Sequence, residues 1–81
     1  MEPTIHSDAA RILQGMLADV RRASGLRQVE VAERLNKPQS FVSDVERGER
    51  RLDVVEFTHF CRAIETNPLD LYIKFVEAAG L

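Results

Sequence analysis

A polar stripe runs along the stretch that ends at Gly48. Its members, spaced as on one face of a helix, are Gln39, Ser40, Ser43, Asp44 and Arg47. A single α-helix fits the major groove of DNA, where polar side chains reach the base edges. Gln39 can hydrogen-bond adenine with both ends of its amide, whereas serine discriminates less sharply between bases. The stripe therefore predicts a helix face that contacts base pairs.

Asp44 is the unusual member of this stripe, because its charge opposes that of DNA. Its carboxylate can accept a hydrogen bond from the amino group of cytosine, but it repels any phosphate nearby. A solvent-facing carboxylate explains the residue equally well. Phe41 also has two interpretations, packing at the edge of the core or covering a thymine methyl group, and packing is favoured.

Two short helices joined by a tight turn must position the stripe, and together they span about residues 28–47. The residues expected to face inward are Val29 and Ala32 in the first helix, with Val31 and Leu35 as further candidates, and Val42 and Val45 in the second. Asn36 tolerates the left-handed backbone that ends a helix, and Pro38 favours the start of the next one. Gly48 is a typical end for the second helix.

An ordered set of residues surrounds and includes the stripe. It comprises Gly25, Leu26, Gln28, Glu30, Ala32 and Leu35, followed by Ser40, Val42, Ser43, Glu46, Arg47, Gly48 and Glu49. This set resembles the helix-turn-helix of the phage repressor and Cro family, also called the XRE family, and the similarity extends from about Ile12 to Tyr72 without an insertion. The resemblance implies an all-α, five-helix, lambda-repressor-like fold whose partner is double-stranded DNA.

The resemblance also implies roles for single residues. The base-contacting positions of the family correspond to Gln39, Ser40 and Ser43. Gln28 matches a glutamine that touches the DNA backbone and braces the recognition helix, at a helix start that also suits a phosphate. Arg21 and Glu46 match an ion pair between the first helix and the end of the recognition helix. Such a pair orients the helix, although desolvation offsets its attraction.

The charges are unevenly distributed along the chain, whose net charge is −2. Residues 21–51 hold eight basic and five acidic residues, a net charge of +3, and the remainder is correspondingly acidic at −5. Phosphate attraction is local, on the scale of a Debye length of about 8 Å. The cations expected at the DNA backbone, beside Gln28, are Lys37, Arg47, Arg27 and Arg50. Weak non-specific DNA binding is expected from the overall acidity.

Three further helices are expected around this motif. Ser7 caps a first helix that reaches Ala23, with Ile12, Leu13, Met16, Leu17 and Val20 on its apolar face and Gly25 after its end. Asp53 and Glu56 have the spacing of a capping box for a fourth helix, with Val54, Phe57, Phe60, Cys61 and Ile64 on its apolar face. Asn67 and Pro68 begin a C-terminal helix over about residues 68–79.

The C-terminal helix carries more apolar residues than one packing face needs: Tyr72, Ile73, Phe75 and Val76, with Leu81 beyond its end. One recognition helix covers only a few base pairs, too few for selection within a genome. Dimers of this family contact two half-sites about 34 Å apart. We therefore expect a homodimer through the C-terminal helix.

Composition limits the remaining possibilities. The 81 residues suffice for one small domain, taken as residues 1–81, whose first six residues are expected to form an arm. Cys61 is a single cysteine, and no signal peptide or long apolar run is visible, so a cytoplasmic protein without a membrane partner is expected. His6 and His59 lack metal-ligand spacing, and no phosphate loop or nucleophile motif occurs. The expectation is no catalysis, no metal and no cofactor.

These observations predict a sequence-specific DNA-binding transcriptional regulator, a repressor that occludes a promoter as a dimer. One alternative is an antitoxin that represses its own operon. Another is a protein-interaction module on the same fold. The small and polar stripe argues against the latter, since a protein interface favours aromatic and aliphatic anchors.

Overall fold

Five helices follow one another along residues 7–81, the part of the chain that the computed structural model describes. They are α1 (Asp8–Ala23), α2 (Gln28–Leu35), α3 (Gln39–Arg47), α4 (Val54–Ala63) and α5 (Pro68–Ala79). This range contains no β-strand, so the expected all-α, five-helix fold is confirmed. None of the helices within it is long and apolar enough to cross a membrane. The arm expected at residues 1–6 lies outside the described residues.

Local chemistry sets the helix ends largely as the sequence predicts. The Ser7 side chain accepts a hydrogen bond from Ala10 N at 3.2 Å, and Asn67 accepts from Leu69 N at 2.9 Å. Asp53 and Glu56 form the expected capping box, with Glu56 N donating to Asp53 Oδ1 at 2.7 Å and Asp53 N donating to Glu56 Oε1 at 2.9 Å. Left-handed backbone follows α2 at Asn36 (φ 55°) and α3 at Gly48 (φ 82°).

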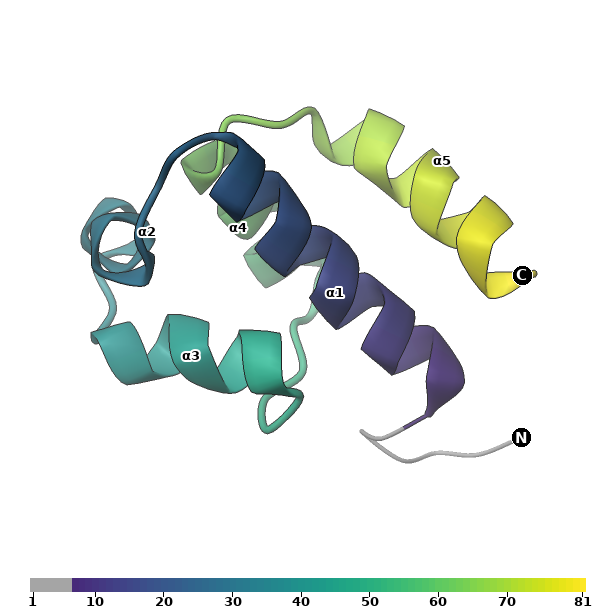
Figure 1. The fold of residues 1–81 in the computed structure, drawn as a ribbon, viewed down its shortest axis with the longest axis horizontal. Helices are drawn as coiled ribbons and strands as arrows, with labels where there is room; N and C mark the ends of the chain where they lie inside the picture. The colour runs from purple at the N-terminus through teal and green to yellow at the C-terminus, as the bar shows by residue number, and fades with distance from the viewer. Residues whose placement is uncertain (1–6) are drawn as a thin grey trace.

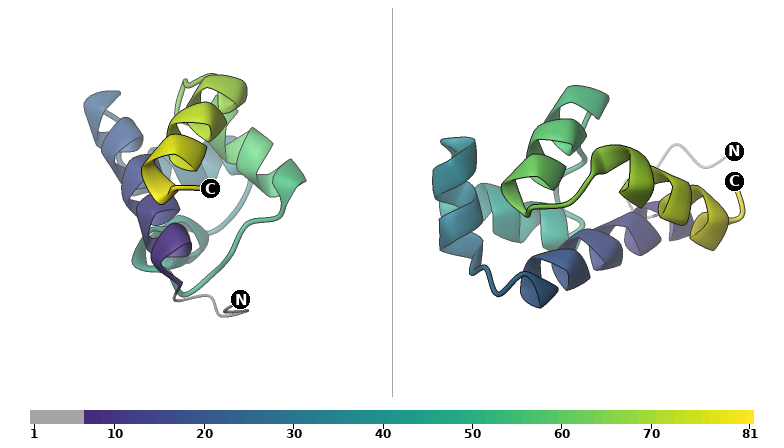
Figure 2. Two further views of the ribbon diagram at one scale, coloured as in Figure 1. Left: turned by 90° about the vertical axis from the view of Figure 1, so that its right-hand side faces the viewer. Right: turned by 90° about the horizontal axis from the view of Figure 1, so that it is seen from above.

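Helix α1 lies between α3 and α5 and contacts both (Figure 1). Helix α2 packs on α3 and α4, and α4 packs on α5, which closes the ring of helices around one core (Figure 2). The buried core residues are Leu17, Val31, Ala32, Val42, Val45, Phe60, Cys61, Ala63, Ile64 and Leu71. Every helix contributes at least one of them, so the position of α3 depends on the whole set.

Two valines lie where the sequence pattern did not place them. Val29 was expected inside but is 37% exposed, whereas Val31 is fully buried. Gln28, Val31 and Leu35 share one line of α2 at spacings of three and four, and Val29 lies off that line. Val54 was expected on the apolar face of α4 but is 80% exposed, and it is the first residue of that helix.

Two side chains, one from the residue that caps α1 and one from α2, fix the end of α4. Ser24 Oγ donates to Ile64 O at 3.0 Å, and Arg34 Nη1 donates to Ala63 O at 2.8 Å. Arg34 also pairs with Glu65 at 3.0 Å, and Glu65 has a left-handed backbone (φ 64°). The turn into α5 is therefore tied to α1 and α2.

Candidate nucleic-acid interface

The outer face of α3 carries the polar stripe that the sequence predicts. Gln39, Ser40 and Arg47 are exposed, and Ser43 and Asp44 are half-buried. On the opposite side, Val42 and Val45 are 0% and 2% exposed and anchor the helix in the core. Among the five members of the stripe, only small or polar side chains meet solvent, so the face offers hydrogen-bonding groups with little apolar surface.

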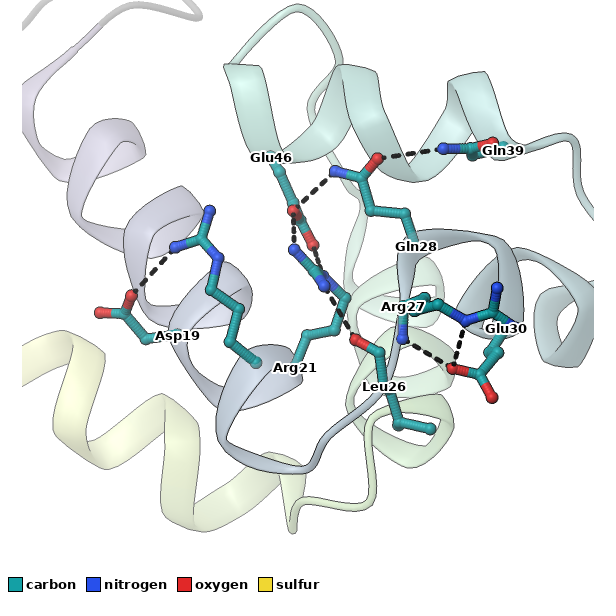
Figure 3. A network of polar contacts seen from close by, with 9 residues as sticks. Asp19, Arg21, Leu26, Arg27, Gln28, Glu30, Gln39 and Glu46 are labelled. Atoms are coloured by element: carbon teal, nitrogen blue, oxygen red, sulfur yellow. Dashed lines mark hydrogen bonds and ion pairs between the residues drawn. The ribbon is translucent and has the colours of Figure 1, made fainter.

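Arg21 and Glu46 join α1 to α3 through a two-point ion pair. Arg21 Nε donates to Glu46 Oε2 at 2.6 Å, and Arg21 Nη2 donates to Glu46 Oε1 at 3.0 Å. Their side chains are only 10% and 5% exposed. A third donor of the guanidinium, Nη1, bonds Leu26 O at 2.8 Å, in the turn before α2. The pair therefore fixes the angle between α1 and α3 and the entry to α2 (Figure 3).

Gln28, the first residue of α2, extends this network to the start of α3. Its Nε2 donates to Glu46 Oε1 at 2.9 Å, and its Oε1 accepts from Gln39 Nε2 at 3.4 Å. Figure 3 shows the Gln28 amide between the two residues. One side chain thus contacts a residue near each end of α3. This contact orients the Gln39 amide on the outer face of the helix.

Asp44 and Arg47 form an ion pair on the outer face that the sequence interpretation missed. Arg47 Nη2 donates to Asp44 Oδ1 at 2.7 Å, with the side chains 65% and 39% exposed. The signal was present in the sequence, because opposite charges three residues apart on a helix are neighbours. The pair leaves the stripe with no net charge.

Phe41 brings together two of the cations expected at the DNA backbone. The ring is half-buried and packs against the core, as favoured from the sequence. Lys37 Nζ lies 5.5 Å and the Arg50 guanidinium 5.1 Å from its centroid. Arg50 also pairs with Glu56 at 2.6 Å. Within residues 7–81 no carboxylate pairs with Lys37, so its charge remains available.

Arg27 lies apart from these cations, at the start of α2. Glu30 Oε1 accepts a hydrogen bond from Arg27 N at 2.8 Å and one from Arg27 Nε at 3.3 Å. The bond from the Arg27 backbone N–H, aided by the guanidinium, lowers the pKa of the Glu30 carboxyl below its usual value. The charge of Arg27 is therefore partly compensated, although its side chain is 76% exposed.

Cys61 belongs to the core and not to this interface. Its side chain is fully buried, and burial raises the pKa of the thiol to about 11. A thiol of this kind stays protonated near neutral pH and is a poor nucleophile.

Comparison with known proteins assigns this arrangement to a class. A family model described as a helix-turn-helix domain matches residues 10–71, most of the chain. The chain is also 47% identical to an XRE-family like protein from Pseudomonas syringae pv. tomato str. DC3000, with a TM-score of 0.86. That match covers 91% of this chain and 90% of the other. The chain therefore belongs to the XRE family of helix-turn-helix proteins, a family of DNA-binding regulators.

Two more distant structures share the fold. The restriction-modification controller protein C.Esp1396I, solved as a tetramer in complex with its natural 35 base-pair operator, gives a TM-score of 0.80 at 17% identity, over 89% of this chain and 95% of that one. The clp gene regulator ClgR from C. glutamicum gives 0.76 at 22% identity, over 95% of each chain. No curated protein sequence matches the chain significantly.

Proposed function

We propose that the protein is a cytoplasmic, sequence-specific transcriptional repressor that binds operator DNA as a homodimer. The observation that carries the proposal is the outer face of α3, which is polar, solvent-facing and held by the buried contact of Arg21 with Glu46. A face held in this way meets the major groove without first being ordered, so binding loses less conformational entropy.

Base contacts and backbone contacts come from different residues in this proposal. Gln39, Ser40 and Ser43 face base edges, with the Gln39 amide suited to adenine. Phosphates are contacted by Gln28 and by three cations, Arg27, Lys37 and Arg50. Lys37 is the strongest of these candidates, because its charge has no carboxylate partner within residues 7–81. Repression then follows from steric occlusion of the promoter and needs no catalytic step.

The dimer contact in this proposal lies on α5 and the start of α4. Within residues 7–81, six of the seven exposed large hydrophobic residues lie on these helices or just beyond the end of α5: Val54, Val55, Leu69, Tyr72, Ile73 and Leu81. An open hollow of about 490 Å³ lies between the two helices, lined by apolar residues that include Val54, Phe57, Leu69 and Tyr72. Apolar surface of this kind usually marks a protein contact, and a second copy supplies the second recognition helix that a two-fold operator requires.

The test is competition binding with an operator selected from random-sequence DNA. Gln39→Ala should weaken binding to the selected operator by ~1–3 kcal/mol and leave random DNA nearly unaffected. Lys37→Ala should weaken both DNAs similarly, because a phosphate contact carries no sequence information. Lys74→Ala is the matched control, since it removes the same charge from α5, on the far side of α1 from α3. If selection enriches no sequence, or if Gln39→Ala binds every DNA as the wild type does, the proposal is wrong.

A further inference from the structure

Arg47 is the last residue of α3, and it lies midway across the width of the outer face, between the lines of Gln39 and Asp44. It follows Ser40 by seven residues, two helical turns, so both side chains lie on one line of the helix. Ser43 lies one turn before Arg47 on the same face. A side chain in this position points toward the floor of a groove that holds α3, whereas the phosphates lie to either side.

Asp44 changes what this arginine can bind. The carboxylate lies 2.7 Å from Nη2 and cancels the net charge of the guanidinium, which weakens its attraction for a phosphate. The hydrogen-bond donors are not cancelled. A guanidinium has five N–H groups, only one of them is used here, and Arg47 has no other partner within residues 7–81. The Asp44–Arg47 pair has no net charge but keeps free, neighbouring N–H donors. It therefore suits two uncharged hydrogen-bond acceptors better than an anion.

We infer that Arg47 contacts the O6 and N7 acceptors of a guanine in the major groove, and that Asp44 is the positioning residue that holds the guanidinium for this contact. Guanine is the only base that presents two acceptors side by side on its major-groove edge, and arginine matches them with two parallel donors. The inference rests on the proposed function. It moves Arg47 from the backbone contacts expected from the sequence to the base contacts.

The spacing along α3 predicts where the guanine lies. Gln39 and Arg47 are eight residues apart, which is about 12 Å along the helix axis. Base pairs are about 3.4 Å apart, so the guanine should lie roughly three to four base pairs from the position that Gln39 contacts. The two positions are therefore resolved in a panel of operators changed at one base pair each.

The test measures the affinity of the full chain for such a panel, built on the selected operator. The wild type should lose roughly ten- to a hundredfold in affinity when one particular guanine is replaced. Substituting 7-deazaguanine there, which lacks the N7 acceptor, should also weaken wild-type binding. Arg47→Met keeps a long, unbranched side chain but removes every donor. It should bind the intact, substituted and 7-deazaguanine operators with equal affinity, while still depending on the base pair that Gln39 contacts.

Asp44→Asn tests the positioning role without changing the size of the side chain. It should lower the preference for the same guanine, because the guanidinium is no longer held. It should also raise the affinity for random DNA, because the arginine is released toward phosphates. For the same reason the slope of log affinity against log salt should become steeper by about one per subunit. Arg50→Ala is the matched control. That cation pairs with Glu56, and its loss should weaken every operator in the panel equally.

The outcomes that contradict these expectations distinguish a failure of the guanine contact, of the positioning role and of the proposed function. If the wild type depends on base identity but Arg47→Met keeps every preference, or Arg47→Ala weakens all operators equally, the guanine contact is wrong and the proposed function stands. If Asp44→Asn loses its preference at a different base pair, Asp44 contacts a base itself and the positioning role is wrong. If the wild type shows no base preference anywhere, the proposed function fails as well.

Discussion

Gln28 and Gln39, the first residues of α2 and α3, meet through their side-chain amides, with Gln39 Nε2 3.4 Å from Gln28 Oε1. The other end of the Gln28 amide bonds Glu46 Oε1, in the last turn of α3, at 2.9 Å. One amide therefore links both ends of α3 to α2. Because Gln39 is otherwise exposed, its orientation before DNA binding depends on this single partner within residues 7–81.

Gln28→Ala should cost more free energy in operator binding than in the unfolding of the protein. The variant removes the brace of Gln39 and also a proposed phosphate contact. If Gln39 acts through its contact with Gln28, the double variant Gln28→Ala/Gln39→Ala should lose less affinity than the sum of the two single losses, with a coupling of about 0.5 kcal/mol or more. Titration of labelled operator with the four proteins completes this cycle. Strict additivity would show that the two amides act independently.

Removing one partner of the buried Arg21–Glu46 pair should destabilise the fold by ~3 kcal/mol or more. Arg21→Met leaves the Glu46 carboxylate 5% exposed, with the Gln28 amide as its only remaining donor within residues 7–81. Glu46→Leu leaves the buried Arg21 guanidinium with Leu26 O as its only acceptor in the described part of the chain. The double variant should cost less than either single variant, since no charge stays unpaired. Urea unfolding of the three proteins measures these differences.

The matched control for this pair is Arg22, which lies next to Arg21 and contacts Asp19 at 3.6 Å with both side chains well exposed. Arg22→Ala should change the free energy of unfolding by less than about 1 kcal/mol. Small and additive losses at Arg21 and Glu46, comparable to the loss at Arg22, would contradict the prediction that burial makes the first pair sensitive.

Operator affinity should fall with salt at a slope of roughly −4 to −7 in a plot of log affinity against log salt, if four to eight phosphates are neutralised per dimer. The motivating feature is the +3 charge of residues 21–51 in an otherwise acidic chain. Lys37→Ala should make this slope less steep by about one per subunit. Titrations at several salt concentrations give the slope, and a flat response would rule out the electrostatic account.

Ile73→Glu should convert the proposed dimer into a monomer without unfolding it. The side chain is 57% exposed, so a charge there is solvated in the monomer but buried in a contact between two copies of α5. Sedimentation equilibrium should show a lower mass and operator titration a weaker affinity, while the urea midpoint of a dilute sample changes little. The adjacent Lys74→Ala is the control and should remain dimeric. A wild type that is monomeric at all concentrations, with and without operator, would remove the basis for this contact.

Folding stability should decline between about pH 9 and pH 11 through Cys61. Burial raises the pKa of its thiol to about 11 in the folded protein, against an ordinary value of 9.0 in the unfolded chain. The unfolded chain therefore loses this proton first, so stability present below pH 9 is lost as the pH rises toward 11. Cys61→Ala should show a smaller decline than the wild type when urea unfolding is compared at pH 7.5 and pH 10. Parallel declines would mean that the thiol titrates normally.

The sequence predicted the helices well because their ends are set locally. Ser7, Asp53 and Asn67 each bond N–H groups within three residues, which depends on nothing distant in the chain. The inward faces were harder to predict. Val29 is exposed because the half-buried Gln28 occupies the inner line of α2, and this follows only from its partner Glu46 in α3.

The site was predictable as a set of residues but not as a network. The resemblance to a known family indicated Arg21 with Glu46, which lie 25 residues apart and have no local signal. Asp44 and Arg47 are three residues apart, so charge spacing alone would have indicated their pairing. Arg34 had no predicted role, because its bond to Ala63 O joins helices that meet only in the folded chain.

The position of α1 between α3 and α5 has a consequence for the operator (Figure 1). In the proposed dimer, the path from one recognition helix to the other runs through packed helices and buried contacts, and Ser24 and Arg34 fix the turn into α5. An extra base pair between half-sites moves one of them by about 3.4 Å and turns it by roughly 35°. Within residues 7–81, this path runs through contacting helices, and no long linker on it can absorb such a change. The number of base pairs between half-sites should therefore be invariant among the natural operators of this protein, even where the bases between them differ.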